Sequence, residues 1–483
     1  MAGLMSTEKA YEAEVGAEPQ HPVSQDEEKL AQSILDKENG SRTEVADEEE
    51  TEMRDPLEPE NDMQSIHDPA EVAGDSPPLT KTVSRFPNGG LNAWLQVAGS
   101  FFLFMNTWGM ANTFGVYQTY YETELLSDHS PSSISWIGSF AAFLLLIVGV
   151  VTGPLYDAGY FRHLLYVGCF LTVFGLMMTS LCTEYWQVFL AQGLVLGLGS
   201  GALFIPSVAI VSQYFDTKKA LATGIAAAGS SIGGVIYPIT FHRLQPQIGF
   251  AWATRVLGFI SLGTLLIPLL VMKVRLRPSA KRPLVDWSAL KEPPFLYFCA
   301  ANFFGFMGLY TPFYYLPTYS VAKAGLTAEF SVYTIPIANA LSTFGRIFPN
   351  YLADKTGPIN MMAPCAIISG LLSFCWIRMS TEGSVIVFAL LYGFFTGSFV
   401  SLPPTCVITL SPHLGIVGTR MGMLFAFSAL GLLVGTPVAG AILGDAASFV
   451  GIQAFCGALM LLSGALLAMS RISKVGVSLT VRA

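Results

Sequence analysis

The sequence has few charged side chains. Only 12% of its 483 residues are Asp, Glu, Lys or Arg, whereas soluble domains usually carry about 25%. Hydrophobic residues make up 52% of the chain, and the mean hydropathy is +0.52. This shortage of charge, together with 34 Phe and 46 Gly, indicates a protein that crosses a membrane several times rather than a soluble domain.

Several kinds of functional motif are also missing. The sequence has no Gly-x-x-x-x-Gly-Lys-(Ser/Thr) loop, so ATP is not expected to be the energy source. The seven cysteines form no Cys-x-x-Cys or Cys/His cluster, and we interpret them as small hydrophobes rather than metal ligands or disulfides. Four histidines stand singly in loops or at helix ends: His129, His163, His242 and His413. We therefore predict no enzyme activity, no metal, no cofactor and no nucleic-acid partner.

Charge is divided unevenly along the chain. Residues 1–85 hold 22 acids and 7 bases, a net charge of −15, whereas residues 86–483 have a net charge of +7. The first segment is nearly free of aromatic residues, so it cannot bury enough surface to fold. We predict that residues 1–85 form a disordered acidic cytoplasmic tail. The tail is either a solvated spacer or a regulatory segment, modified at a residue such as Lys9 and recognised by partners that the sequence does not identify.

Twelve apolar segments are long enough to cross a bilayer, which needs about 20 residues per helix. They are roughly residues 93–118, 133–153, 164–182, 185–212, 219–241, 252–272, 294–318, 331–352, 359–378, 384–410, 419–442 and 449–470. The predicted fold is an all-α polytopic membrane protein with twelve transmembrane helices in two pseudo-symmetric six-helix bundles. The bundles span residues 86–272 and 293–470, with a basic cytoplasmic linker at 273–292 and a cytoplasmic C-terminal tail at 471–483.

The orientation follows from the bases in the connections. With both termini in the cytosol, sixteen Lys and Arg residues lie on the inner side, Arg420 among them, and three lie on the outer side. We therefore predict a multi-pass protein with cytoplasmic N- and C-termini. No conventional N-terminal signal directs the chain to an organelle, so the plasma membrane is the expected location.

The two halves repeat one another. The end of the second predicted span reads GPLYDAGYFRHLL, and the end of the eighth reads NYLADKTGPINMM. Three pairs share an offset of 197 residues: Leu155 with Leu352, Asp157 with Asp354, and Pro206 with Pro403. A repeat of this kind is typical of transporters whose halves rock about a central site.

These two turns resemble the Gly-x-Leu-x-Asp-x-x-Gly-Arg loop of the major facilitator superfamily. The residues that match are Gly153, Leu155, Asp157, Gly159 and Arg162 in the first copy and Leu352, Asp354, Lys355 and Gly357 in the second. An Asp at a helix end can accept backbone N–H bonds from a neighbouring helix or pair with a base. The resemblance implies that these contacts hold an inner gate shut; simple end-capping of the helix is the alternative.

Two further stretches resemble the fungal form of the monocarboxylate-porter branch of that superfamily. PNGGLNAW precedes the first span, with Asn88 where the branch has Asp. YFDTKKALATGIAAAGSSIGG leads into the fifth span and places Lys218 and Lys219 at its inner end. Small residues recur there every fourth position, as at Gly224, and this spacing predicts close helix packing.

Arg346 is the ionisable residue that we place well inside a span. A charge near mid-membrane costs at least ~2.5–3.5 kcal/mol, so it normally faces a partner or a polar cavity. No acidic residue lies inside a predicted span, and we interpret the missing counter-charge as an anionic substrate such as a carboxylate. Monocarboxylate porters carry a substrate-contacting arginine at the matching place. The alternative is that Arg346 extends toward cytosolic water and pairs with Asp354 or Asp157.

Two departures from the branch affect the expected cargo. Animal members pair this arginine with an acid, which is Ser342 here, and place a lysine where this chain has Asn112. Losing both groups makes proton-coupled lactate transport doubtful and favours a larger, less acidic cargo. The predicted substrate-binding residues are Arg346, Asn112, Asn302, Trp108 and Tyr314, with Asn106 and Tyr310 as further cavity groups; the aromatic rings are equally compatible with packing.

The leading hypothesis is a secondary active or facilitative transporter that moves a small organic anion or metabolite by alternating access. Many fungal relatives look suited to exporting a secondary metabolite, so export of such a compound is one hypothesis; the sequence leaves the direction of transport open. Uptake of a monocarboxylate or vitamin-like nutrient is the alternative within transport. A membrane sensor that does not transport is the alternative from another class, and a channel is disfavoured by the repeat. The expected partners are the small-molecule cargo and membrane lipid.

Overall fold

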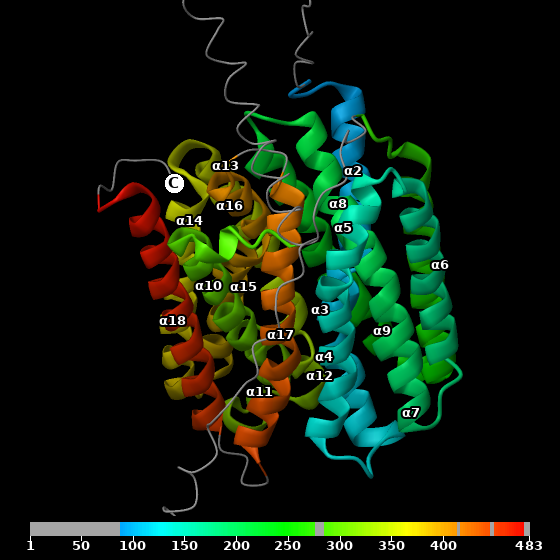
Figure 1. Ribbon diagram of the computed structural model, residues 1–483. Coiled ribbons are helices and arrows are strands. Elements are labelled where there is room, and N and C mark those ends of the chain that lie inside the picture. The colour runs from blue at the N-terminus through cyan, green and yellow to red at the C-terminus, as the bar shows by residue number, and fades with distance from the viewer. Residues whose placement is uncertain (1–86, 276–284, 413–415, 445–448, 478–483) are drawn as a thin grey trace, which may run out of the picture. The chain divides into compact units, whose positions relative to one another are not determined.

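The computed structural model describes residues 87–275, 285–412, 416–444 and 449–477. The predicted acidic tail, the middle of the predicted linker and residues 478–483 of the C-terminal tail lie outside the described residues. Everything described lies in one compact unit, and its regular secondary structure is entirely helical (Figure 1).

The first half of the chain forms helices between Leu91 and Val271. They are α2 (Leu91–Asn106), α3 (Trp108–Tyr120), η1 (Tyr121–Leu125), α4 (Pro131–Ile147), α5 (Gly149–Asp157), α6 (Phe161–Thr179), α7 (Tyr185–Val188), η2 (Phe189–Val195), α8 (Leu196–Tyr214) and α9 (Lys219–Val271). Within α9, Gly249 has φ 76° and ψ 165°, a conformation that suits glycine and divides the element into two helices.

The second half forms helices between Ala289 and Val475. They are η3 (Ala289–Lys291), α10 (Pro293–Leu309), α11 (Thr311–Ala324), α12 (Ala328–Ser331), α13 (Thr334–Thr356), α14 (Pro358–Cys375), η4 (Trp376–Arg378), α15 (Glu382–Ser401), α16 (Pro403–Leu410), α17 (Val417–Leu443) and α18 (Phe449–Val475). Figure 1 shows α10 to α18 on one side and α2 to α9 on the other.

Joining helices that follow one another directly, and dividing α9 at Gly249, gives twelve membrane-spanning segments, as predicted. Eight helices in the described part of the chain qualify as membrane spans by length and composition alone. The first span is broken before Trp108 and the seventh at Tyr310. Each of the four resulting pieces is shorter than 18 residues, the length required of a single membrane-spanning helix in that count. The eighth span, α13, is rich in polar residues. These interrupted or polar spans carry most of the predicted site residues.

Close backbone packing joins the two halves where α9 meets α13. A Cβ added at Gly224 would overlap the carbonyl oxygen of Arg346 and would lie 2.9 Å from Cβ of Asn350. The predicted close packing of the small residues in the fifth span is therefore confirmed at this position. The contact brings the backbone of the first half directly against the arginine-bearing helix of the second.

Candidate functional site

Arg346 lies on α13 where this helix packs against α9, and its side chain is buried, with 3% of its surface exposed. Its Nε donates to Oγ of Ser342 and its Nη1 to the carbonyl oxygen of Ala227, both at 3.4 Å. No carboxylate of the described side chains forms an ion pair with it. The alternative pairing with Asp354 is absent among these ion pairs, and the side chain of Asp157 lies outside the described residues. A cation held only by long bonds to neutral groups favours a further anionic or polar partner.

Polar side chains on three helices continue from Arg346. Nδ2 of Asn112, on α3, donates to Oδ1 of Asn339 at 3.1 Å, and Oγ of Ser231, on α9, donates to Oγ of Ser342 at 3.2 Å. We call the five residues Asn112, Ser231, Asn339, Ser342 and Arg346 the polar seam. The seam joins the first and fifth spans to the eighth.

Asn339 is a member of this seam that the sequence analysis missed. It precedes Ser342 by three positions and Arg346 by seven, so all three lie on one face of a helix. Asn350, four residues after Arg346, extends the stripe and donates to the Arg346 carbonyl and to Ser401. The 3.6-residue spacing of polar groups in an apolar segment could have identified Asn339.

Trp108 and Tyr310 stack at the breaks of the first and seventh spans. Their ring centroids are 6.0 Å apart and the planes are inclined by 13°. Asn112 of the polar seam follows Trp108 by about one turn of α3. Nε1 of Trp108 is buried and has no hydrogen-bond acceptor among the described residues. The aromatic pair and an indole donor without an acceptor thus lie beside the polar seam.

The remaining predicted site residues differ in their surroundings. Nδ2 of Asn302 donates to the Phe298 carbonyl at 2.8 Å, and its Oδ1 is buried without a donor among the described residues. Tyr314 is buried with its ring 5.7 Å from that of Phe114.

Asn106 has a different role from the one suggested by its sequence position. It accepts from the Tyr237 hydroxyl at 2.8 Å and donates to Thr264 at 2.9 Å. It therefore links α2 to both parts of α9 within the first half. This arrangement indicates a structural role.

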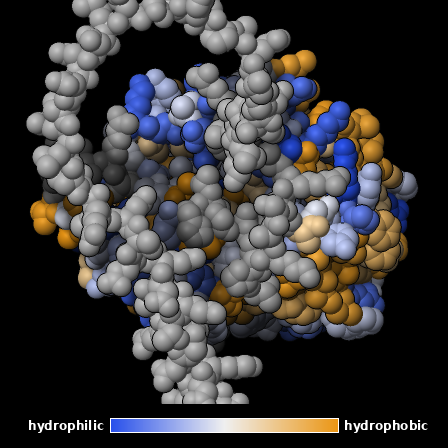
Figure 2. All heavy atoms as spheres, turned by 45° about the horizontal axis from the view of Figure 1, so that its top comes forward, coloured by the Kyte–Doolittle hydropathy of each residue, from blue (hydrophilic) through white to orange (hydrophobic). Residues whose placement is uncertain are grey.

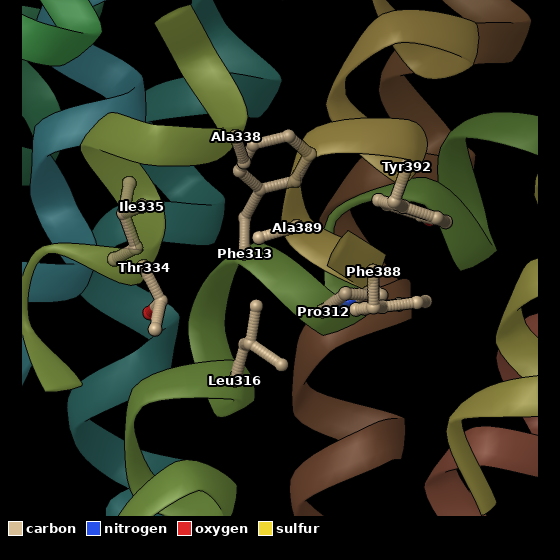
Figure 3. Close-up of a pocket in the computed structure, with 9 residues that line it drawn as sticks. All are labelled: Pro312, Phe313, Leu316, Thr334, Ile335, Ala338, Phe388, Ala389 and Tyr392. Carbon is tan, nitrogen blue, oxygen red and sulfur yellow. The ribbon is translucent and has the colours of Figure 1, made fainter. Parts of the chain in front are cut away.

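Two small cavities lie within the helical core. One, of about 10 Å³, is surrounded by side chains of α11, α13 and α15, including Phe313, Ala338 and Tyr392 (Figure 3). The other, of about 20 Å³, lies in the first half and is lined by residues that include Phe114 and Gln192. Each has room for about one water molecule. A larger molecule would enter only if the helices around these cavities moved apart.

Asp354 closes one end of the contact between the halves. Its Oδ1 accepts from the backbone N–H of Ala220 at 2.9 Å and its Oδ2 from that of Leu221 at 3.0 Å. These amides belong to the first turn of α9, where N–H groups lack partners within the helix. The carboxylate therefore caps the first turn of α9 from the other half, which is one of the two contacts considered above for an Asp at this helix end.

The other predicted gate residues surround this end or lie in the first repeat. Nζ of Lys219 is 4.0 Å from Oδ1 of Asp216, and Nζ of Lys355 is 4.3 Å from the centre of the Tyr351 ring. Lys218 is exposed beside the start of α9. Nη1 of Arg162 donates to the Leu269 carbonyl at 2.6 Å, which joins α6 to the end of α9 within the first half. Of the predicted bases, only Lys219 and Lys355 lie on elements that flank the Asp354 contact.

The motif before the first span contacts the motif that leads into the fifth span. Oδ1 of Asn88 accepts from the backbone N–H of Asp216 at 2.7 Å and of Thr217 at 3.1 Å, and the Trp94 and Phe215 rings lie 5.1 Å apart. Asn88 has φ 51°, a left-handed conformation that Asn tolerates. The segment before the first span therefore holds the loop that leads into α9.

The halves also meet near the far end of the part of α9 that precedes Gly249. Arg243 follows Ala220 by 23 residues, or about 35 Å of helix, and its Nη1 is 4.0 Å from Oε1 of Glu329. On other helices that join the halves, the hydroxyls of Ser139 and Thr436 are 2.5 Å apart. The halves are thus in contact at both ends of the seam.

Sequence reasoning placed Arg420 among the cytosolic bases and missed its burial. Its Nε donates to Asp286 at 3.0 Å, while Nη2 and Nη1 donate to Glu292 at 2.5 and 2.8 Å. The Arg420 side chain is fully buried. The end of the linker is therefore fixed to the start of α17.

Arg255 is the sixth residue after the Gly249 kink. Its Nε donates to Ser180 at 3.1 Å, and its guanidinium lies 4.9 Å from the Trp252 ring centre. Arg255 therefore has two neighbouring partners near the start of the part of α9 that follows Gly249. Its setting differs from that of the buried Arg346.

The chain is similar to membrane transporters of known sequence. The family model described as Major Facilitator Superfamily matches residues 94–413. The MFS-type transporter dbaD of Emericella nidulans is 48% identical over 379 residues, which cover 78% of this chain and 85% of that protein. The aspyridones efflux protein of the same species is 41% identical, with coverage of 81% and 80%. The agnestins efflux protein of Paecilomyces divaricatus is 36% identical, with coverage of 87% and 95%.

A solved structure has the same fold. The fucose:proton symporter of E. coli superposes with a TM-score of 0.59 over 78% of this chain and 98% of that chain, at 16% sequence identity. This likeness agrees with the twelve helices counted here.

Proposed function

Because the chain belongs to the major facilitator superfamily, a family of membrane transporters, we propose that it exports a small-molecule metabolite by alternating access. Relatives that match most of the chain include efflux proteins named for the aspyridones and the agnestins. Their names support export rather than uptake. The duplicated halves, in contact at both ends of the polar seam, suit a cycle in which the two ends open in turn.

Burial of Arg346 without an ion-pair partner in the described part of the chain is the observation that carries the proposal. A buried guanidinium is stable only when hydrogen bonds or an opposite charge compensate its desolvation. Ser342 and the Ala227 carbonyl supply two bonds of 3.4 Å, which are long for charged groups. A cargo with a carboxylate, an enolate or a polarised carbonyl would complete this set.

Buried groups of the first and seventh spans define the rest of the proposed cargo. The Trp108 indole offers a buried donor, Asn302 offers a buried acceptor, and the stacked rings of Trp108 and Tyr310 offer a flat apolar face. Planar ring systems pack well against such faces. We propose a ring-bearing organic molecule with one acidic or strongly polarised oxygen group, larger than a simple monocarboxylate. Arg346, Asn112, Asn302, Trp108 and Tyr314 are the proposed contacts.

Asp354 is the proposed inner gate. Its two bonds to Ala220 and Leu221 would form when that end closes and break when it opens. The excess of bases near this end supports its placement in the cytosol, with both termini on the same side and the plasma membrane as the location. The polar motifs around Asn88 and Lys218 support assignment to the monocarboxylate-porter-like branch.

The proposal is tested by comparing metabolites inside cells and in the medium, with and without the protein. Export predicts a compound that accumulates in cells lacking the protein and declines in their medium. That compound is then labelled and its flux measured in vesicles containing the purified chain. Saturable flux that Arg346→Ala lowers at least roughly tenfold, and that the exposed control Lys323→Ala preserves, supports the proposed site.

Other outcomes distinguish the alternatives. Depletion of the compound from the medium by cells that carry the protein would indicate uptake of a nutrient instead. Saturable binding without flux would indicate a sensor and would contradict the proposal. Full flux in the Arg346→Ala variant would show that transport does not require Arg346, and would contradict the proposed binding site but not the proposed transport.

A further inference from the structure

An apolar groove of about 400 Å³ runs between α6 and the part of α9 that follows Gly249. Its walls include Tyr166, Phe170 and Val173 from α6 and Leu262, Leu266 and Leu269 from α9. Several of these side chains are open to the surroundings, with 64% of Phe170 and 48% of Leu266 exposed. Figure 2 shows hydrophobic side chains gathered on the flank where Figure 1 places α6. The groove therefore opens on a surface that faces lipid.

The internal repeat shows that the fold does not require this groove. The offset of 197 pairs α6 with α14 and the end of α9 with α18. There a Cβ added at Gly370 would lie 2.9 Å from Cγ of Leu461, and one at Gly464 would lie 2.5 Å from Cγ1 of Ile367. Glycine thus lets α14 and α18 approach closely, whereas Val173 occupies the position of Gly370 in α6. The two halves therefore pack differently at this position, with glycine in α14 and valine in α6.

Positive charge lies at one end of the groove. Arg162 precedes Tyr166 by one helical turn, and its Nη1 donates to the carbonyl oxygen of Leu269, itself a groove residue. Lys273 follows Leu269 by four positions and is exposed. Neither α6 nor α9 contains an acidic residue. The groove is thus apolar along its length and basic at one end. We call the end with Arg162 and Lys273 the basic mouth.

We propose that this groove binds an acyl chain of an anionic phospholipid whose headgroup lies against Arg162 and Lys273. A volume of about 400 Å³ falls within the ~300–1,000 Å³ typical of small-molecule pockets. Bases at the membrane surface attract anionic headgroups, and buried methylene groups add to the affinity. The basic mouth favours an anionic phospholipid over a neutral lipid or a sterol. This site does not depend on the identity of the cargo or the direction of transport.

The test uses the full chain purified in mild detergent and native mass spectrometry with two probes, phosphatidylserine and phosphatidylcholine of identical acyl chains. We expect one phosphatidylserine to be retained per chain in preference to phosphatidylcholine. The double variant Arg162→Gln/Lys273→Gln should reduce this preference roughly 30-fold, the effect of removing two bases near the membrane surface. Glutamine at position 162 keeps a donor for the Leu269 carbonyl. Equal retention of the two lipids by the unmodified chain would overturn the proposal.

A second variant tests the groove itself. Val173→Trp should fill it and remove the retained lipid, whereas Leu371→Trp, at an exposed position on α14, should not. Thermal unfolding of both variants checks that they fold. If Val173→Trp does not fold, the double charge variant decides the question alone. Equal lipid retention by folded Val173→Trp and Leu371→Trp, or recovery of a sterol or the exported compound instead of phospholipid, would contradict the proposed occupant.

Discussion

The side-chain amides of Asn112 and Asn339 are joined by a 3.1 Å hydrogen bond between the first span of one half and the eighth span of the other. Seven residues after Asn339, on the same helix face, Arg346 donates to a carbonyl oxygen of α9. The two hydrogen bonds join the halves, and the second is made by the buried Arg346 guanidinium itself. Cargo that reaches Arg346 must therefore compete with, or replace, bonds that keep the halves together.

Replacing Arg346 should impair transport far more than folding. Arg346→Ala removes the charge that the cargo is proposed to meet, and Arg346→Lys retains charge but loses the planar fork. A charged hydrogen bond contributes about 1.5–3 kcal/mol, so flux should fall roughly 10- to 100-fold in the alanine variant and by less in the lysine variant. Vesicle flux of the compound found by metabolite comparison measures both. A lysine variant as inactive as alanine would argue that shape rather than charge is recognised.

The amide pair should show coupling in a double-mutant cycle. Asn112→Leu or Asn339→Leu leaves the other amide buried without its partner, which costs about 1–3 kcal/mol. The double variant should be less destabilised than the sum of the single variants because both polar groups are gone. Thermal unfolding of the purified protein measures the three changes. If the two single changes in melting temperature simply add up in the double variant, the hydrogen bond contributes nothing to the stability of the conformation described here.

Asp354 should control opening of its end of the protein. Asp354→Asn removes the charge and one of the two acceptors offered to Ala220 and Leu221. We expect faster hydrogen exchange at the first turn of α9, because opening exposes these amides. Asp216→Asn is the matched control, since Asp216 also lies near Lys219 but 57% of its side chain is exposed. Equal exchange in both variants would leave Asp354 as a simple helix cap.

Asn88 should be replaceable only by residues that keep its cap and its backbone conformation. Asn88→Asp preserves an acceptor for the Asp216 and Thr217 amides and should retain stability. Asn88→Gly tolerates φ 51° but lacks the side-chain acceptor. Asn88→Ala lacks the acceptor and is also strained at this φ. The melting temperature should therefore fall in the order Asp, Gly, Ala. Alanine as stable as aspartate would show that the motif contact is dispensable for folding.

The sequence predicted the twelve spans because each depends on a local run of apolar residues. It also predicted that Arg346 lies inside a span, because a charged residue is conspicuous in such a run. The 197-residue offset likewise identified Asp354 as a counterpart of Asp157. The bonds of Asp354 to Ala220 and Leu221 were not predictable in detail, because they depend on how α9 packs against α13. The Trp108–Tyr310 stack requires two broken helices to meet, and no local pattern specifies that meeting.

Arg420 illustrates the same limit more strongly. Its carboxylate partners lie 134 and 128 residues away in sequence. The positive-inside count predicts a cytosolic position for Arg420, a prediction that depends on charge alone. Its complete burial depends on the path of the linker around the start of α17.

The Arg420 cluster should make the stability of the second half sensitive to acid. Burial raises the pKa of Asp286, but hydrogen bonds from Ser288, Arg420 and the Ala289 amide, with the charge of Arg420, bring the net pKa below its usual value. A carboxyl with a lowered pKa in the folded state stabilises the protein above its unfolded pKa of about 3.9, and this contribution is lost as pH falls through the folded pKa. Melting temperature should therefore decline below about pH 4 in the unmodified chain and decline less in Asp286→Asn. At neutral pH, Asp286→Asn should be less stable than the unmodified chain because one charge opposite buried Arg420 is removed. Asp216→Asn, at an exposed position, should change neither value. Identical acid profiles for the unmodified chain and Asp286→Asn would show that Glu292 alone neutralises Arg420.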